Sequence, residues 1–124
     1  MEDRLDILEL CARYQQLFDD GMSEAWADTF CPDGYFEGPA GTAHGRDELA
    51  AFCQETVSQF PVALHFTDHH VLDPLPEGAV RHRCILSVQY PTKNGVKIAL
   101  YRYDDELEQV NGQWKFKTRR VLDP

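Results

Sequence analysis

Apolar residues recur at helical spacing through most of the first half of the chain. In the opening segment they fall at positions 5, 7, 8, 10, 11, 14, 17 and 18, which predicts an amphipathic helix ending at DDG (19–21). Ser23 has the chemistry of an N-cap, and it predicts a short helix, EAWADTF, that ends before Pro32. DGYFEGPAG (33–41) predicts a turn, a short strand and a second turn, and GRDELAAFCQETVSQF (45–60) predicts a second long helix.

After Pro61 the apolar and polar residues alternate with a period of two, which is typical of strands. The predicted strands are 62–72, 79–91, 96–109 and 113–122. Asn94-Gly95 and Asn111-Gly112 favour tight hairpins between the later strands. Helices followed by a four-stranded meander predict an α+β fold with the helices on one face of an antiparallel sheet. A length of 124 residues favours one domain, 1–124.

The charge of the chain limits the classes of partner. A formal net charge of −9 argues against nucleic acid and against anionic membranes, because both attract clustered Lys and Arg. The one basic run, KFKTRR (115–120), alternates like a strand and is interpreted as a sheet face. The acidic, amphipathic start is unlike a signal peptide. Four cysteines without a CxxC pair predict buried free thiols in a reducing cytoplasm.

The segment LHFTDHH (64–70) holds three of the five histidines. In a regular strand, His65 and His69 point to one face, whereas Asp68 and His70 point to the other. The whole cluster therefore cannot meet on one metal ion.

The order of these segments resembles the SnoaL-like branch of the nuclear transport factor 2-like superfamily. The resemblance spans nearly the whole chain and is carried by LCARYQQLFDDG, WADTFCPDGYFEGPAG, GRDELAAF, LHFTDHHV and NGQWKFKTRRV. It implies a cystatin-like α+β roll, in which a cone-shaped, strongly curved antiparallel sheet and three helices enclose an apolar pocket. The superfamily includes ketosteroid isomerases, scytalone dehydratase, lindane dehydrochlorinase, polyketide cyclases and epoxide hydrolases. It also includes binding-only proteins and small subunits of dioxygenases, so the fold does not select a reaction.

The resemblance to the dehydratases and dehydrochlorinases implies a catalytic dyad of Asp19 and His65, with Asp20 as the competing partner. A neutral imidazole accepts a proton near pH 7, and a carboxylate on its other nitrogen fixes the tautomer. The leading hypothesis is a cofactor-independent lyase or isomerase that abstracts a proton from carbon of an apolar, cyclic or polyketide-like molecule. The alternative is a ligand-binding protein or an accessory module of an oxygenase that converts nothing.

Further residues are candidates for contact with the ligand. Tyr14 and His69 are predicted polar helpers, and Arg120 either enters the pocket or stays at the surface in a salt bridge. The predicted apolar lining or core consists of Trp26, Phe36, Phe52, Tyr90, Tyr101 and Trp114. His65, His69 and Asp19 together would form a facial triad for iron, but the resemblance favours chemistry without metal or cofactor.

The resemblance also implies a homodimer that pairs through the outer face of the sheet. Alternating apolar residues are the candidates for that interface, namely Ile85, Ala99, Tyr101 and Val121.

Overall fold

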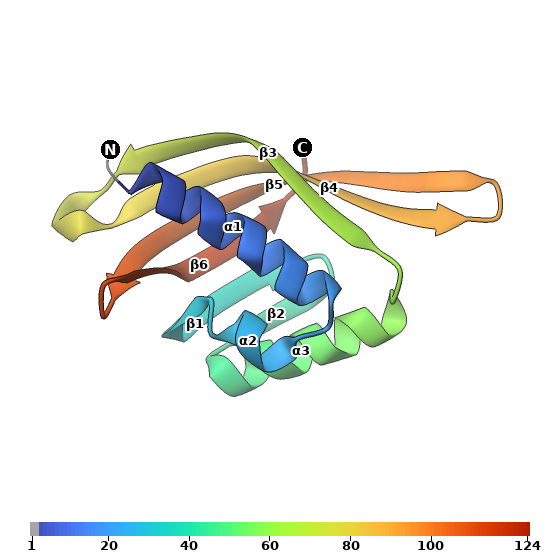
Figure 1. The fold of residues 1–124 in the computed structure, drawn as a ribbon, viewed down its shortest axis with the longest axis horizontal. Helices are drawn as coiled ribbons and strands as arrows, with labels where there is room; N and C mark the ends of the chain where they lie inside the picture. Colours follow the sequence, from blue (N-terminus) through green and yellow to red (C-terminus); the bar gives the residue numbers. More distant parts are fainter. Residues whose placement is uncertain (1–2) are drawn as a thin grey trace.

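The computed structural model describes residues 3–124, and Figure 1 shows its helices and strands. The elements are α1 (Arg4–Asp19), α2 (Ser23–Ala27), β1 (Phe30–Gly38), β2 (Gly41–His44), α3 (Arg46–Gln59), β3 (Leu64–Pro74), β4 (Val80–Thr92), β5 (Gly95–Val110) and β6 (Gln113–Leu122). The predicted helices and the four predicted C-terminal strands are all present, so the α+β prediction is confirmed.

The six strands form one sheet in the order β2-β1-β6-β5-β4-β3. Neighbours pair antiparallel except for β1 and β6, which pair parallel, so the sheet is mixed rather than purely antiparallel. β1 begins at Phe30, inside the segment predicted as helix, because Phe30 pairs with Phe116 of β6. Pro32 is tolerated because it lies between Phe30 and Tyr35, where the pairing with β6 is irregular. Met22, and not Ser23, occupies the N-cap position of α2.

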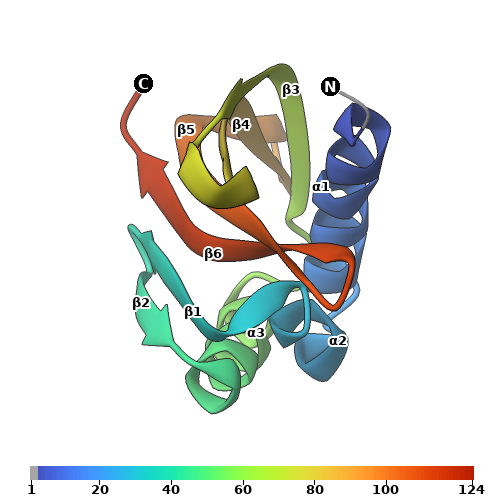
Figure 2. The same ribbon diagram turned by 90° about the vertical axis from the view of Figure 1, so that its left-hand side faces the viewer.

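The helices lie against the concave face of the sheet. Figure 2 shows α1 beside β3 and the sheet curving away from it, while α2 and α3 lie near β1. The side chains buried between helices and sheet are mostly apolar and aromatic, including Ile7, Trp26, Phe30, Leu49, Leu107 and Phe116. Burial of this apolar surface is the main stabilising contribution to the fold. Among the described residues, no helix is long and apolar enough to cross a membrane.

A continuous row of buried residues crosses the whole sheet on its concave face. In order from β2 to β3 the row is Ala43, Phe36, Arg119, Asp105, His82 and Leu72, each paired in register with the next. Three adjacent members of the row, Arg119, Asp105 and His82, are polar or charged and nevertheless buried. Buried charges require partners, and here the partners are supplied by direct cross-strand neighbours.

Two β-bulges change which residues face inward. In β3 one extra residue lies between Asp68 and Val71, and His69 takes a positive φ of 59°. In β6 Thr118 pairs with Glu106 but Phe116 pairs with Leu107, so Lys117 is the extra residue. A bulge of this kind reverses the alternation of the side chains beyond it.

The bulges correct two predictions about the sheet faces. His70 instead of His69 turns toward the inside, and Arg119 instead of Arg120 is buried. The prediction for the outer face was also wrong in part. Ala99, Tyr101 and Val121 line the concave side, and only Ile85 belongs to the other face.

Candidate active site

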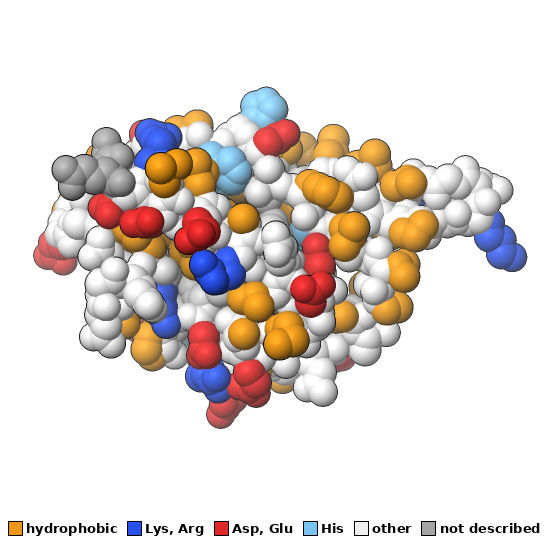
Figure 3. Space-filling view, in the orientation of Figure 1, with side chains coloured by type: hydrophobic (Ala, Val, Ile, Leu, Met, Phe, Trp, Pro, Cys, Tyr) orange, Lys and Arg blue, Asp and Glu red, His pale blue; other side chains and the backbone are white. Residues whose placement is uncertain are grey.

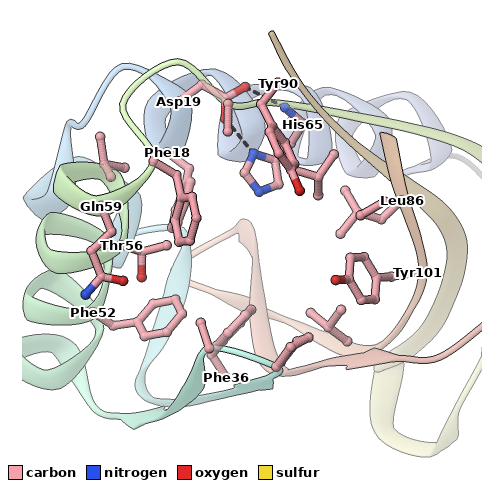
Figure 4. A pocket seen from close by; sticks show the side chains of 18 of the residues that line it. Phe18, Asp19, Phe36, Phe52, Thr56, Gln59, His65, Leu86, Tyr90 and Tyr101 are labelled. Atoms are coloured by element: carbon pink, nitrogen blue, oxygen red, sulfur yellow. Dashed lines mark hydrogen bonds and ion pairs between the residues drawn. The ribbon is translucent and has the colours of Figure 1, made fainter. Parts of the chain in front are cut away.

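A cavity of about 440 Å³ opens between the end of α1, the C-terminal half of α3 and the inner faces of β4 and β5. Its wall is mostly apolar, as Figure 4 shows for the labelled Phe18, Phe36, Phe52 and Leu86. This volume lies within the range of pockets that bind small organic molecules.

Asp19 and His65 meet at the wall of this cavity. The Oδ1 atom of Asp19 lies 2.6 Å from Nδ1 of His65, and the backbone N–H of His65 donates to Oδ2 at 2.9 Å. One carboxylate therefore holds both the ring and the backbone of His65. The two side chains are 9% and 17% exposed, so water has limited access to the pair.

The local sequence explains why Asp19 takes this position. It is the last residue of α1, and the break of the chain at Gly21, whose φ is 71°, ends the helix there. A carboxylate at a helix C-terminus is disfavoured by the helix dipole, and the two hydrogen bonds with His65 compensate for this cost. The ring of Phe18 packs edge-on against the imidazole at 5.1 Å between centroids. Asp20 is exposed and forms none of these contacts.

The hydrogen bonds define the tautomer of His65. An ionised carboxylate only accepts hydrogen bonds, so Nδ1 carries the proton and donates it to Asp19. The other ring nitrogen, Nε2, then has a free lone pair, and Figure 4 shows it directed toward the cavity. The pair is thus arranged as a general base with a carboxylate behind it.

The polar side chains of the wall follow the regular spacing of the helix or strand that carries them. Phe52, Thr56 and Gln59 follow at i, i+4 and i+7 along α3 and therefore share one helix face. Tyr90 of β4 and Tyr101 of β5 lie on the inward positions of their strands, and Figure 4 shows the hydroxyl of Tyr101 pointing into the cavity.

Tyr14 and Tyr103 are the most buried tyrosines of the wall. Burial raises the pKa of Tyr14 well above its ordinary value and raises the pKa of Tyr103 to about 12. Both phenols are therefore protonated at neutral pH and can donate a hydrogen bond. The Arg119 guanidinium lies behind them, with its central carbon 3.3 Å from the Tyr103 ring centroid and 4.3 Å from that of Tyr14.

The structure brings together seven of the eleven predicted site residues. These are Tyr14, Asp19, Phe36, Phe52, His65, Tyr90 and Tyr101, all of which line the cavity. The catalytic roles assigned to Asp19 and His65 stay predictions.

Four predicted site residues lie elsewhere. His69 lies in the β3 bulge, where it is 77% exposed and pairs with Asp68. Arg120 follows the β6 bulge and is exposed beside the Tyr35 ring. Trp26 is fully buried behind Phe18 and Phe52, and Trp114 lines a second hollow on the other side of α1. Without His69, the facial triad considered for iron does not assemble.

Several wall residues were missed in the sequence. Thr56 and Gln59 follow the helical spacing of Phe52, and Leu86 and Val88 alternate with Tyr90, so periodicity alone could have placed them. Pro39 and Ala40 at the mouth follow from no sequence pattern, because they depend on where the β1–β2 turn approaches the end of β6.

Comparison with known proteins identifies the family and the fold of the chain. A family model described as a SnoaL-like domain matches residues 1–120. No curated protein matches the chain at a significant level. A variant of Rv3472, a protein of unknown function from Mycobacterium tuberculosis, is 28% identical with a TM-score of 0.87, over 97% of this chain and 70% of that one.

Two further solved structures show the same fold at lower identity. Aln2 from a Streptomyces species is 19% identical with a TM-score of 0.88, over 98% of this chain and 91% of that one. A protein from Novosphingobium aromaticivorans, provisionally named a scytalone dehydratase, is 24% identical with a TM-score of 0.83. That alignment covers 96% of this chain and 82% of the other. The predicted superfamily and fold are confirmed.

Proposed function

The chain belongs to the SnoaL-like domain family, and on that premise we propose that it is an enzyme that abstracts a proton from carbon. The substrate is a small, mostly apolar, cyclic or polyketide-like molecule, and the reaction is a dehydration, isomerisation or cyclisation without a cofactor. One observation carries this proposal: His65 is held by Asp19 with its free nitrogen directed into an apolar cavity.

His65 is the general base of the proposed reaction. Its Nε2 accepts the proton from a C–H bond of the bound molecule, and the imidazolium that forms is stabilised by Asp19 at 2.6 Å. The apolar wall strengthens this attraction, because charges interact more strongly where water is excluded. Asp19 is a positioning residue, since it acts through His65.

The electrons left on the substrate need a hydrogen-bond donor. Tyr14 and Tyr101 both line the cavity, and either hydroxyl can donate to an enolate oxygen or to a departing hydroxyl group. The remaining wall recognises shape and apolar surface, which supports a ring-containing substrate with few polar groups. The name of the Novosphingobium aromaticivorans protein is in keeping with a dehydration.

Exchange of hydrogen for deuterium tests the proposal before the substrate is identified. The protein is incubated in D₂O with a panel of cyclic ketones and polyketide-like phenols, and mass spectrometry detects deuterium on carbon. We expect His65→Ala to lower the exchange rate by about 10² to 10⁴-fold, because a positioned general base contributes this much. Asp19→Asn should also lower the exchange rate, while the compounds still bind.

The neighbouring residues provide matched controls. His69→Ala and Asp20→Asn change the same residue types at exposed positions outside the cavity and should leave exchange unchanged. Full exchange by His65→Ala would contradict the proposed mechanism. A wild-type protein that binds members of the panel and exchanges none would favour the rival function, a binding protein or an accessory module of an oxygenase.

We also propose that the chain forms a homodimer through the convex side of the sheet. Half-exposed apolar side chains form an outer patch there, consisting of Leu64, Phe66, Ile98, Leu100 and Leu122. Cross-strand register makes the patch continuous, since Phe66 and Leu100 flank Ser87 on one row. Figure 3 shows hydrophobic side chains gathered beside the β4–β5 hairpin. A contiguous apolar surface of this kind is typical of an interface.

Light scattering at micromolar concentration tests the dimer. We expect a mass of two chains for the wild type and one chain for Leu100→Lys, which places a charge in the middle of the outer patch. Leu5→Lys is the control, because Leu5 is an exposed apolar residue of α1 outside the patch. A monomeric wild type would refute the proposal.

A cytoplasmic location is the third element of the proposal. All four cysteines are free and buried, which suits a compartment where thiols stay reduced. Detection of the native chain in the cytoplasmic fraction of its cells is the corresponding measurement.

A further inference from the structure

A second cluster of side chains lies between α1 and the inner face of β3 and β4, outside the proposed active site. We propose that Cys11, His70 and His82 bind a thiophilic d¹⁰ metal ion, Zn²⁺ or Cu⁺. None of the three residues lines the cavity that holds His65. The proposal goes beyond the proposed enzyme reaction and stands independently of it.

The distances between the three ligand atoms suit a small metal ion. Nε2 of His82 lies 2.9 Å from Nδ1 of His70 and 3.9 Å from Sγ of Cys11, and all three atoms lie within 4.8 Å of one another. With Zn–N near 2.0 Å and Zn–S near 2.3 Å, a tetrahedral site places two nitrogens about 3.3 Å apart and nitrogen and sulfur about 3.5 Å apart. Changes of about 0.4 Å in the two distances from His82 Nε2 would bring both to these tetrahedral values.

The buried carboxylate of Asp105 orients the His82 ring in the way that is usual for metal-binding histidines. Asp105 Oδ2 lies 2.7 Å from His82 Nδ1, and the carboxylate only accepts, so Nδ1 carries the proton. The lone pair of Nε2 therefore faces His70 and Cys11. Metal-binding histidines almost always donate their other N–H to a carboxylate or carbonyl in this way. Asp105 is itself fixed by Arg119, whose Nε lies 3.2 Å from Oδ1.

His70 reaches the cluster through the β3 bulge. Strict alternation would turn this side chain away from α1, but the extra residue beside it reverses the direction. The bulge places His69 at a positive φ of 59°, a conformation that is strained for a residue other than glycine. Strained backbone of this kind is concentrated at functional sites, and here it places an imidazole against His82.

Metal binding exchanges protons for the ion. The S–H bond of Cys11 breaks and its proton passes to solvent. His70 Nδ1 donates a hydrogen bond to His82 Nε2 at 2.9 Å in the metal-free chain, so on binding the ring proton of His70 moves to Nε2 and Nδ1 coordinates. The bond formed is metal to thiolate, and no electron is transferred.

The type of ligand selects the class of metal. A thiolate with two imidazoles favours Zn²⁺ and Cu⁺ over Mg²⁺ or Ca²⁺, which prefer oxygen. Cu⁺ with one thiolate adds no net charge to a site that already contains the Arg119 cation. Zn²⁺ adds one positive charge and leaves a fourth position for water on the His70 side. Both ions share the same protein ligands, and titration distinguishes them.

Metal titration of the untagged, metal-free full chain tests the site. Zn²⁺ is titrated against a fluorescent chelator, and Cu⁺ is titrated under nitrogen against bicinchoninate. We expect one equivalent of at least one of these ions to bind with a Kd below about 1 µM. Whichever ion binds more tightly identifies the metal. Co²⁺ added in place of Zn²⁺ should show a thiolate-to-metal charge-transfer absorption.

Matched variants assign the binding to these residues. His70→Ala should weaken binding by at least about tenfold, whereas His69→Ala, the next residue and exposed, should not. Cys11→Ala should remove the charge-transfer absorption, whereas Cys53→Ala, an equally buried thiol on α3, should retain it. Because His70 is half-buried, its variant is expected to fold, and circular dichroism verifies this.

Two results would overturn the proposal. The first is the failure of both ions to bind the wild type below the stated Kd. The second is binding that His70→Ala and Cys11→Ala leave unchanged, because the metal would then occupy another place. Neither result affects the exchange experiment on His65, so the two proposals fail separately.

Discussion

The protein contains two histidine–aspartate pairs of nearly equal length, one partly buried and one fully buried. In both, a carboxylate oxygen approaches Nδ1 of the imidazole, at 2.6 Å for Asp19 and His65 and at 2.7 Å for Asp105 and His82. In the first pair the side chains are 9% and 17% exposed, and in the second they are both 0% exposed. The same donor and acceptor therefore serve two environments.

The difference lies at the far nitrogen of each ring. Nε2 of His65 faces the cavity, where a substrate can approach. Nε2 of His82 faces His70 and Cys11, so no substrate reaches it but a metal ion can. The paired carboxylate sets the tautomer in both pairs, and the group opposite the second nitrogen decides between proton transfer and coordination.

The two carboxylates also differ in their second partner. Asp105 neutralises Arg119, which is fully buried and stacked between aromatic rings, and the terminal guanidinium nitrogens have no hydrogen-bond acceptor among the described residues. Asp19 has no such cation beside it; among the described residues its one ion-pair partner is His65. Asp105 is consequently expected to contribute mainly to stability, and Asp19 mainly to activity.

The largest expected effect follows from removing these carboxylates. Asp105→Ala should lower the free energy of unfolding by about 3–5 kcal/mol, because Arg119 is left buried without a counter-charge. Asp19→Ala should cost about 1–3 kcal/mol, since it leaves the His65 backbone N–H without a partner. Urea denaturation monitored by circular dichroism measures both values.

Asp105→Asn is measured beside Asp105→Ala, because it keeps the volume of the side chain and removes only its negative charge. If Asp19→Ala destabilised the chain as much as Asp105→Ala, the division between a structural and a functional pair would be wrong.

The first pair could be predicted from the sequence, whereas the second could not. Asp19 and His65 lie before any irregularity, at a helix end and near a strand start, and family resemblance was enough to match them. Asp105, His82 and Arg119 become neighbours only through cross-strand register. Alternation counted along the chain fails beyond a bulge, so it selected His69 and Arg120 in place of His70 and Arg119.

The elements themselves were largely predictable, for a different reason. Helical and strand periods are local, and the Asn-Gly pairs at 94–95 and 111–112 mark the β4–β5 and β5–β6 hairpins. The parallel pairing of β1 with β6 was not predicted, because it joins segments more than eighty residues apart. No local pattern encodes such a contact.

A substitution that fills the cavity should weaken ligand binding without changing metal binding. The size of this effect is intermediate among the predictions. Ala99 lines the cavity from β5, and Ala99→Trp should weaken ligand binding by at least about tenfold, because the indole occupies the space of the ligand. Metal binding at Cys11 should be unchanged. Binding is measured by calorimetry with a compound from the exchange panel.

Leu100→Trp is the matched control, because the adjacent residue lies on the convex side and is half-exposed. Equal weakening by both variants would mean that the cavity is not the ligand site. Loss of metal binding in Ala99→Trp would mean that the two regions are coupled.

The smallest expected effect is a change in the pH dependence of stability. Burial, assisted by His82 and Arg119, lowers the pKa of folded His70, and the Thr67 backbone and Asp68 oppose this only in part. The unfolded chain takes up this proton as pH falls through about 6.5, before the folded chain does, so the free energy of unfolding decreases with falling pH in that window.

His70→Gln removes the titrating imidazole, so the free energy of unfolding should fall less between pH 7.5 and pH 5.5. The protein is kept metal-free with a chelator. Urea denaturation at the two pH values provides the measurement, with His69→Gln as the exposed control that retains the wild-type slope. An unchanged slope in His70→Gln would show that this imidazole is already solvated. His70 would then resemble an ordinary surface histidine. The contrast between the Asp105–His82 pair and the Asp19–His65 pair would rest on His82 alone.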